Sequence, residues 1–556
     1  MSDNRVSDVL AQAFAAEGVD TLFTLMGDAN MYWSASMADN QKVRLIHARH
    51  EHCCVAMADA YARATGKVGV GSVTCGPGYT QIMTALAMAA RGNAPVVVFA
   101  GDAPIGASWY IQSIDQAPLA LATGAHFVPI RTIDRALDCV REAFYVARAD
   151  RKPVVLSVPL DLQTEEFPYL PDYMPSTDLV PRAQLLRPDP AGVDEIVAMI
   201  AEAERPIVIG GRGATWSGAK VALESLAQEI GRAAGDDAAR QGVVRRQSLR
   251  ARYRRHLRHR SWPRVVCRKR SSDRRRGRAR PLHDRGWLSF PQCQGGPNRH
   301  PAARVVAGAA NRRFSCPIRR QGRRRGDRER AQRKGYQPSG LAQQRDRRED
   351  FHDRPQPGHQ AYTPTPGTLD PRPVVKELDA AVPKDWDIIV AGGHCFSFAM
   401  THLHGRPAGK YHIPIDFGAI GSGLPAAIGV AAARNNGKVM LIDGDGSLYQ
   451  HIQELETVRR HGIKLLICII NDGGYGAETH KFRAYGVDPM HATHGRGDLA
   501  QIAHGFGLSG TKVTSLGQFE RLFREHQKQD GASLWDVHVD DLIPSRNFRR
   551  VHYGEA

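Results

Sequence analysis

Residues 438–474 decide the fold, and they read KVMLIDGDGSLYQHIQELETVRRHGIKLLICIINDGG. The apolar runs VMLID and KLLICII are about as long as one strand, and each ends in a turn of Gly with Asp or Asn. Strands of this kind recur along the chain and alternate with helical patterns, which is typical of parallel sheets. We therefore predict an α/β fold in which parallel sheets are flanked by helices.

The two turns place polar side chains just past the ends of these strands. Asp445 lies in GDGS (444–447) and Asn471 begins NDGG (471–474). Open α/β sheets bind ligands at the carboxyl ends of their strands. Asp, Asn and backbone carbonyl oxygens suit a hard cation such as Mg2+, and glycines beside Asp445 let backbone N–H groups approach a diphosphate. Either tetrapeptide alone is also typical of an ordinary turn; their combination indicates a site.

Three α/β patterns follow one another along the chain. Residues 1–165 alternate β-rich runs with helical stretches, the first of which we expect Ser7 to cap. A Pro-rich link at 164–188 precedes a second unit that begins at 189, and a linker at 361–369 precedes the third. We therefore predict three domains, at 1–165, 189–350 and 366–545.

The net charge of +18 is concentrated in one stretch. Residues 241–350 carry 32 Arg and 2 Lys against 7 Asp and Glu, and they have neither strand alternation nor an apolar helical stripe. A basic nucleic-acid-binding arm, a disordered insert and a shifted reading frame in a GC-rich gene all remain open. We favour the shifted frame, from about 232 to 350, because out-of-frame GC-rich codons yield Arg, Gly, Pro and Ala, and both flanks have ordinary composition.

The expected compartment rests on features that the sequence lacks. The N-terminal stretch has no apolar signal-peptide core, and no apolar run approaches the length of a membrane span. The nine cysteines show no paired metal-ligand spacing, which suits a reducing compartment. We expect a cytoplasmic protein without membrane or nucleic-acid partners.

Further motifs lie near the N-terminus. Glu51 opens a helical stretch in RHEHCCVAMADAYARATGKVGV (49–70), and the turn GPGYTQ (76–81) comes after it. Taken alone, Glu51 could equally interact with the dipole of its own helix. Together with GDGS and NDGGYG, these segments resemble the thiamine diphosphate enzymes of the acetolactate synthase and pyruvate decarboxylase superfamily. The resemblance covers roughly 1–232 and 360–545 and implies three α/β domains: pyrimidine-binding, middle and diphosphate-binding.

The resemblance also implies roles for individual residues. Glu51 would hydrogen-bond N1′ of the aminopyrimidine, so that the cofactor acts as its own base with help from the protein. Mg2+ would be held by Asp445, Asn471 and the Gly473 carbonyl, and Ile420 would support the bent cofactor. Ile420 could also be an ordinary core residue, and His394 a structural histidine. The other residues expected to contact the cofactor are Gly78, Gln81, His394, Cys395, Gly418, Gly444, Gly446 and Ser447. Gln81 departs from the family, which has Asn at this position, and Cys53 and Cys54 replace small residues and are interpreted as packing residues.

The motifs indicate the cofactor more specifically than they indicate the reaction. Asp28 in LMGDANMYW and Glu478 in NDGGYGAE resemble acids of the decarboxylases that protonate the product, although a turn role and a surface position are the plain alternatives. Gln112 in IQSID resembles a glutamine of the synthases, and the His pair of the decarboxylases is missing. We therefore expect carboligation of 2-oxoacids, as in acetolactate synthases, ahead of simple decarboxylation. An inactive or basic nucleic-acid-binding product is the alternative of another class.

The resemblance also bears on assembly and on a second cofactor. Family members place the active site between two subunits, so we expect a homodimer or homotetramer. Synthases bind FAD in the middle domain. The middle region contains a glycine-rich turn formed by Gly210, Gly211 and Gly213. The rest of such a site would lie in the Arg-rich stretch, so the sequence does not decide whether FAD binds.

Overall fold

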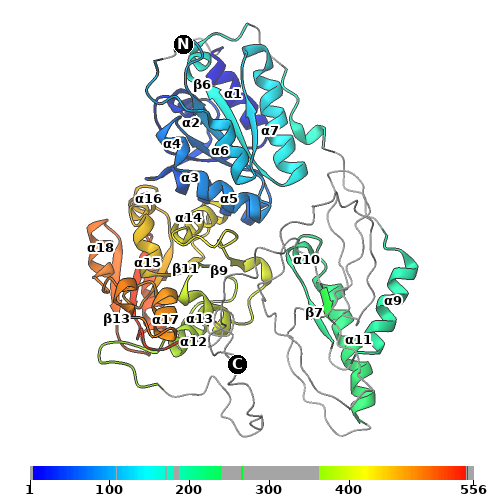
Figure 1. The fold of residues 1–556 in the computed structure, drawn as a ribbon, viewed down its shortest axis with the longest axis vertical. Coiled ribbons are helices and arrows are strands. Elements are labelled where there is room, and N and C mark those ends of the chain that lie inside the picture. The colour runs from blue at the N-terminus through cyan, green and yellow to red at the C-terminus, as the bar shows by residue number, and fades with distance from the viewer. Residues whose placement is uncertain are drawn as a thin grey trace, which may run out of the picture.

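The computed structural model describes residues 4–107, 109–168, 172–180, 187–203, 206–239, 264–266, 362–545 and 548. Two parallel α/β units account for most of them and lie one above the other, with α9, α10 and α11 beside them (Figure 1). Nearly all of the Arg-rich stretch, and with it the interpretation as a shifted frame, lies outside the described residues. Among the described residues, no helix is both long and apolar enough to cross a membrane.

The first sheet has six parallel strands in the order β2-β1-β3-β4-β6-β5. Helices between the strands return the chain to the end of the sheet where the strands begin, which is the connection that parallel strands require. The strands are β1 (Thr21–Thr24), β2 (Arg44–His47), β3 (Gly69–Val73), β4 (Val96–Asp102), β5 (His126–Pro129) and β6 (Pro153–Pro159). The helices are α1 (Val6–Ala16), α2 (Met31–Asp39), α3 (Glu51–Thr65), α4 (Pro77–Thr80), α5 (Met83–Gly92), α6 (Gln116–Thr123), α7 (Ala136–Asp150) and α8 (Leu160–Thr164).

The second sheet repeats this arrangement in the order β10-β9-β11-β12-β14-β13. Numbered from its own first strand, it has the strand order of the first sheet. Its strands are β9 (Asp387–Val390), β10 (Tyr411–His412), β11 (Val439–Gly444), β12 (Leu466–Asn471), β13 (Ser509–Val513) and β14 (Ser533–His538). Its helices are α12 (Pro371–Ala381), α13 (His394–His402), α14 (Gly423–Arg434), α15 (Asp445–Leu448), α16 (Glu454–Arg460), α17 (Gly476–Ala484), α18 (Leu499–Gly505) and α19 (Phe519–Lys528).

The described part between the two sheets is small. It consists of α9 (Pro190–Ala201), β7 (Ile207–Ile209), α10 (Arg212–Trp216), α11 (Lys220–Ala239) and β8 (Arg264–Val266), and β7 pairs with β8 in the antiparallel sense.

The prediction that Ser7 caps the first helix was wrong. The helix begins at Val6, Arg5 is the N-cap without a side-chain hydrogen bond, and Ser7 is buried inside the first turn. Packing of this turn against the rest of the first unit therefore outweighs the capping preference of Ser.

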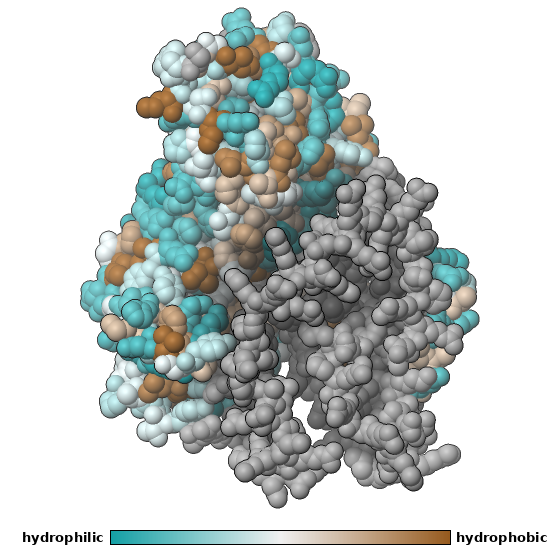
Figure 2. All heavy atoms as spheres, viewed as in Figure 1, coloured by the Kyte–Doolittle hydropathy of each residue, from teal (hydrophilic) through white to brown (hydrophobic). Residues whose placement is uncertain are grey.

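The strongly apolar strands are the central ones. Every residue of β6 and β12 is buried, because helices cover both faces of a parallel sheet. The outer faces of the two sheets have separate cores, whereas a third core runs from the first unit into the second. On the face drawn in Figure 2, apolar residues are interspersed with polar ones over both units.

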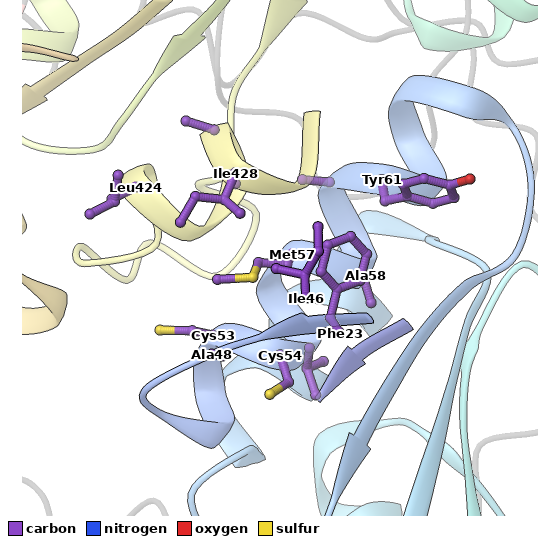
Figure 3. Close-up of a cluster of buried hydrophobic side chains, with 14 of the residues drawn as sticks. Phe23, Ile46, Ala48, Cys53, Cys54, Met57, Ala58, Tyr61, Leu424 and Ile428 are labelled. Atoms are coloured by element: carbon purple, nitrogen blue, oxygen red, sulfur yellow. The ribbon is translucent and has the colours of Figure 1, made fainter. Parts of the chain in front are cut away.

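Helices α3 and α14 join the two units. In the shared core, Met57 and the thiol-bearing Cys53 and Cys54 of α3 lie with Leu424 and Ile428 of α14 (Figure 3), and both cysteines are fully buried. The burial agrees with their interpretation as packing residues.

Close approach of these helices needs a glycine. A Cβ atom at Gly429 would lie 2.3 Å from the Met57 carbonyl oxygen, so only Gly allows this spacing. Arg434 at the end of α14 also donates to the Ala64 carbonyl at 2.8 Å and to the buried Asp387 carboxylate. Lys410 and His412 contact the same carboxylate at 2.8 Å each.

Candidate functional site

The carboxyl ends of β11 and β12 bring Asp445 and Asn471 together, as the sequence predicts. The two strands pair directly, with Gly444 opposite Ile470. Asp445 is the next residue after β11 and opens α15, and Asn471 is the last residue of β12. Both side chains are buried, at 1% and 0% exposure. The neighbouring strand ends therefore form one polar site at the edge where parallel sheets bind ligands.

Within the described residues, neither oxygen of the Asp445 carboxylate has a hydrogen-bond partner. Burial, and then the nearby Asp472 carboxylate, raise the pKa of Asp445 well above its usual range. His494 offers partial compensation, with Nε2 3.7 Å from Oδ2. Burial also raises the pKa of Asp443, which lies two residues earlier, to about 7. A buried carboxylate without donors, close to a second carboxylate, favours a bound cation, so these residues fit Mg2+.

Asn471 is oriented by its neighbours. Its Nδ2 donates to Asp536 Oδ1 at 2.7 Å and to the Arg496 carbonyl at 3.0 Å. Its Oδ1 is thereby turned toward the following loop, where it accepts from Gly473 N–H at 3.2 Å. The amide oxygen is thus presented as a metal ligand requires.

The Gly473 carbonyl is already engaged. It accepts from the backbone N–H groups of His494 at 3.0 Å and Gly495 at 2.9 Å. Gly473 as a metal ligand therefore stays a prediction, and binding would have to displace at least one of these bonds. No cluster of three or more His, Cys, Asp or Glu side chains arranged for a metal occurs in the described part of the chain. The predicted set, with one carboxylate and two neutral oxygens, is not such a cluster.

The glycine turn after β11 is tightly packed. A Cβ atom at Gly446 would lie 2.9 Å from the Tyr475 ring, so this position accepts only Gly without movement of the ring. Ser447 Oγ accepts from Gly421 N–H at 2.9 Å and thereby ties α15 to the segment that holds Gly418 and Ile420. Gly418 has φ +82° with open space around it, and Ile420 is half-buried.

His394 and Cys395 begin α13 beside this turn. The His394 Nε2 accepts from Ser545 N–H at 3.0 Å, and its Nδ1 lies 3.7 Å from Asp472 Oδ2. The Cys395 thiol is buried and lies 3.7 Å from the Gly392 carbonyl oxygen, and burial raises its pKa. Both side chains therefore lie near the site, but His394 is bonded to the C-terminal segment in this structure. Their contact with a diphosphate stays a prediction.

Glu51 opens α3, as predicted, and its helix is capped by the preceding His50. A Cβ atom at Gly78 would lie 3.4 Å from Glu51 Oε1, so the carboxylate and the GPG turn are brought together. Gln81 at the end of the turn is exposed.

The residues beside Glu51 contact the second unit. Arg49 N–H donates to Glu454 Oε1 at 2.9 Å, and the His52 ring bonds the Ser422 hydroxyl at 3.0 Å. The start of α3 is thus fixed against the segments that precede α14 and follow Asp445.

The residues that the sequence linked to the reaction fall into two groups. Asp28 is exposed and lines a cavity of about 390 Å³, whereas Gln112 is half-buried and accepts from the Cys75 thiol at 3.3 Å. Glu478 lies on the exposed side of α17, 3.2 Å from Lys481. The surface alternative for Glu478 therefore describes its position within one chain. The other lining residues of the cavity are Met31, Tyr32, Pro104, Leu160, Asp161 and Thr164.

Sequence reasoning missed several polar groups of the site. Glu454 is fully buried, accepts from Thr457 Oγ1 at 2.7 Å, and has a pKa raised by burial. Nothing in its local sequence marks it as buried. Asp472, in contrast, is the second residue of the NDGG turn, so its acidic side chain beside Asn471 could have marked it as part of the site.

Two family models match the chain. The model described as thiamine pyrophosphate enzyme, N-terminal TPP binding domain, matches residues 4–119, and the corresponding C-terminal TPP binding domain matches residues 391–537. Thiamine pyrophosphate is another name for thiamine diphosphate. The matched ranges contain the Glu51 helix and the Asp445–Asn471 site, respectively.

The curated relatives are similar over nearly the whole chain. The probable acetolactate synthase 2, chloroplastic, of Oryza sativa subsp. japonica is 25% identical, over 98% of this chain and 85% of that protein. The acetolactate synthase isozyme 2 large subunit of Escherichia coli strain K12 is 27% identical, over 96% and 95%.

Solved structures share the fold. A thiamine diphosphate-dependent 4-hydroxybenzoylformate decarboxylase of Rhodococcus jostii RHA1 gives a TM-score of 0.63 at 20% identity, over 96% of this chain and 99% of that one. A putative thiamin diphosphate-dependent enzyme of Mycobacterium smegmatis gives 0.64 at 17% identity, with the same coverage.

Proposed function

The chain belongs to the thiamine diphosphate-dependent enzyme superfamily, and from this premise we propose that it is a 2-oxoacid decarboxylating carboligase of the acetolactate synthase type. The observation that carries the proposal is the pair of sites already described. A buried carboxylate without donors lies beside an oriented Asn amide in one unit, and Glu51 lies against the GPG turn in the other.

Residues of both units would hold the cofactor. Asp445, Asn471 and, after exchange of its present bonds, Gly473 would bind Mg2+, which in turn neutralises a diphosphate. Gly444, Gly446 and Ser447 would lie against the diphosphate, and Glu51 would hold a proton at N1′ of the aminopyrimidine. When bound, thiamine diphosphate supplies the carbon nucleophile for the 2-oxo group and the electron sink for loss of CO2.

The protein's own task is to select the fate of the donor after CO2 has left. In carboligation, the bond between the donor's carboxylate and its 2-oxo carbon breaks, and a new carbon–carbon bond forms to the 2-oxo carbon of a second molecule. The oxygen of that carbon takes up a proton that comes overall from water. Such an enzyme needs a binding place for the second 2-oxoacid rather than an acid that protonates the donor's carbon. Gln112, whose amide lies beside the GPG turn, supports this choice.

Simple decarboxylation is the second candidate, and one observation favours it. Asp28 is exposed on the wall of an open surface pocket of about 390 Å³ and could serve as a proton donor there. Glu478, which would act with it, is paired with Lys481 at the surface. We therefore place decarboxylation after carboligation.

We further propose that the active form is a homodimer or a larger homo-oligomer. Large apolar side chains are exposed on both units: Trp109 at 81% and Ile111 at 94% beside Gln112 in the sequence, and Tyr485 at 78% and Met490 at 62% at and after the end of α17. Burying such side chains against a second copy would complete a site between the units of two subunits.

A cytoplasmic location and the state of the middle region are also proposals. The six cysteines of the described residues are free thiols, which agrees with a reducing compartment. Cell fractionation would test the location. The nucleotide sequence across codons 225–360 would test the shifted frame, and purification of a frame-corrected chain would show whether FAD binds.

An assay of products tests the reaction. The protein is incubated with pyruvate, Mg2+ and thiamine diphosphate, and acetolactate is measured as acetoin after acid treatment, in parallel with free acetaldehyde. Acetolactate as the main product supports carboligation, and acetaldehyde as the main product supports the alternative. An Asp445→Ala variant, which should form neither, controls for contaminating enzymes.

A further inference from the structure

A turn before α6 lies directly on the GPG turn. Gly76 has φ +57°, and a Cβ atom there would lie 2.5 Å from the Gln112 carbonyl oxygen. The turn that presents Gln112 is closed by a hydrogen bond from Ser113 N–H to the Tyr110 carbonyl at 3.0 Å. The glycine therefore permits a contact that positions Gln112 beside the segment that also faces Glu51.

The side chain of Gln112 is held in this contact by a hydrogen bond. The thiol of Cys75, the residue before Gly76, donates to Gln112 Oε1 with a sulfur–oxygen distance of 3.3 Å. Cys75 is fully buried, and burial raises its pKa, so the sulfur keeps its proton at neutral pH. A protonated thiol selects the oxygen of the amide, and the Nε2 group must then point to the opposite side.

The Cys75 thiol also acts on Tyr110, which begins the turn that presents Gln112. Burial, and then the adjacent Cys75 thiol and Asp28 carboxylate, raise the pKa of Tyr110 to about 12. Tyr110 is therefore a neutral phenol whose titration both Cys75 and Asp28 influence.

We propose that Cys75 is a positioning residue: its thiol holds Gln112 Oε1, so that the Nε2 donor faces the acceptor 2-oxoacid. The Gln112 NH2 group can donate to the carboxylate or 2-oxo oxygen of such an acceptor. In the flipped amide, Gln112 Oε1 would face these acceptor oxygens without a hydrogen between them, and binding would be weaker. This inference rests on the proposed carboligation and adds the residue that orients acceptor binding.

Kinetics of Cys75→Ala and Cys75→Ser test the role. In the Ala variant the amide loses its orienting donor, so we expect the KM for the acceptor to rise about tenfold, as for loss of one hydrogen bond, with a much smaller change in kcat. More free aldehyde should form per CO2. The Ser hydroxyl can donate to the same oxygen and should restore most of the affinity. Cys139→Ala, which removes a buried thiol bonded to the Pro129 carbonyl elsewhere in the unit, should leave the KM unchanged.

A second readout needs neither cofactor nor turnover. The infrared S–H stretching band of Cys75 is isolated as the difference between wild type and Cys75→Ala. It should move to higher frequency in Gln112→Ala, because the thiol loses its acceptor. If Cys75→Ala does not fold, the difference against Cys75→Ser isolates the same band.

The outcomes separate this inference from the proposed function. No band shift in Gln112→Ala, a Ser variant as impaired as the Ala variant, or an equal fall in CO2 release and carboligation would each overturn the positioning role. If the S–H band shifts in Gln112→Ala but the wild-type protein makes only aldehyde, the thiol–amide contact is established. The acceptor role and the proposed carboligation are then both overturned.

Discussion

The Asp445→Asn substitution should stabilise the protein without metal and remove its stabilisation by metal. Asp445 is 1% exposed, its two oxygens lack hydrogen bonds within the described residues, and the Asp472 carboxylate adds repulsion. A buried group without a partner costs more when it is charged than when it is neutral, and Asn removes the charge and its repulsion from Asp472 at nearly constant volume. In a chelator we therefore expect the variant to be more stable by about 1 kcal/mol, the scale of one such difference. The midpoint should rise by about 2–4 °C for each kcal/mol in a domain of 150–250 residues.

Mg2+ and thiamine diphosphate should make wild type more stable than the Asp445→Asn variant. With Mg2+ and thiamine diphosphate at a hundred times the dissociation constant, wild type gains about 2.7 kcal/mol, because only the folded state binds them. The variant should gain nothing, since it lacks the charged ligand. Thermal unfolding followed by circular dichroism, with and without the two ligands, measures both differences. Asp530→Asn, at an exposed position of the same unit, should change stability by less than about 0.5 kcal/mol in either condition.

Two results would refute this reasoning. A variant that is less stable than wild type in the chelator would mean that Asp445 is satisfied in the folded protein. A variant whose midpoint still rises with Mg2+ and thiamine diphosphate would mean that the cation is held elsewhere.

Three further predictions concern the interface and the cofactor. Gly429→Ala should destabilise the protein by about 1–3 kcal/mol in denaturant unfolding, because its Cβ would lie 2.3 Å from a carbonyl oxygen of α3. The control Gly505→Ala should not destabilise it, because its Cβ would lie in open space at the end of α18. Burial alone would raise the pKa of Asp387, but hydrogen bonds from its three basic partners lower it. Its charge thus stabilises the fold above the unfolded pKa of about 3.9, so Asp387→Asn should be destabilising at pH 7 and nearly neutral in acid, as measured by denaturant unfolding at both pH values. Glu51→Gln should retain Mg2+-dependent binding of thiamine diphosphate in calorimetry but lose turnover; loss of binding would contradict its assigned role.

The strands that could be predicted from the sequence are the inner ones. Runs such as VMLID and KLLICII are apolar because helices cover both of their faces, and that burial leaves a direct trace in composition. The four strands at the edges of the two sheets, β2, β5, β10 and β13, carry a weaker signal. An edge strand has fewer buried positions, as in RLIH of β2 and SGTKV of β13, so its composition resembles that of a loop.

The site divides in a similar way. Asp445, Asn471 and Glu51 could be predicted because each begins or ends a regular element at a recognisable turn. The contacts of His394 with Ser545 and of Cys75 with Gln112 join residues far apart in the sequence, and no local pattern encodes them.

The repeated strand order has a consequence for the origin of the chain. Helices α3 and α14 occupy the same step in the two units, between the second and third strands, and each packs on the other. The GPG turn and the GDGS turn likewise both come after the third strand. This is the pattern expected of a duplicated α/β unit whose two copies pack through the same helix. Two equivalent loops on one chain can take different ligands, because a change in one leaves the other intact.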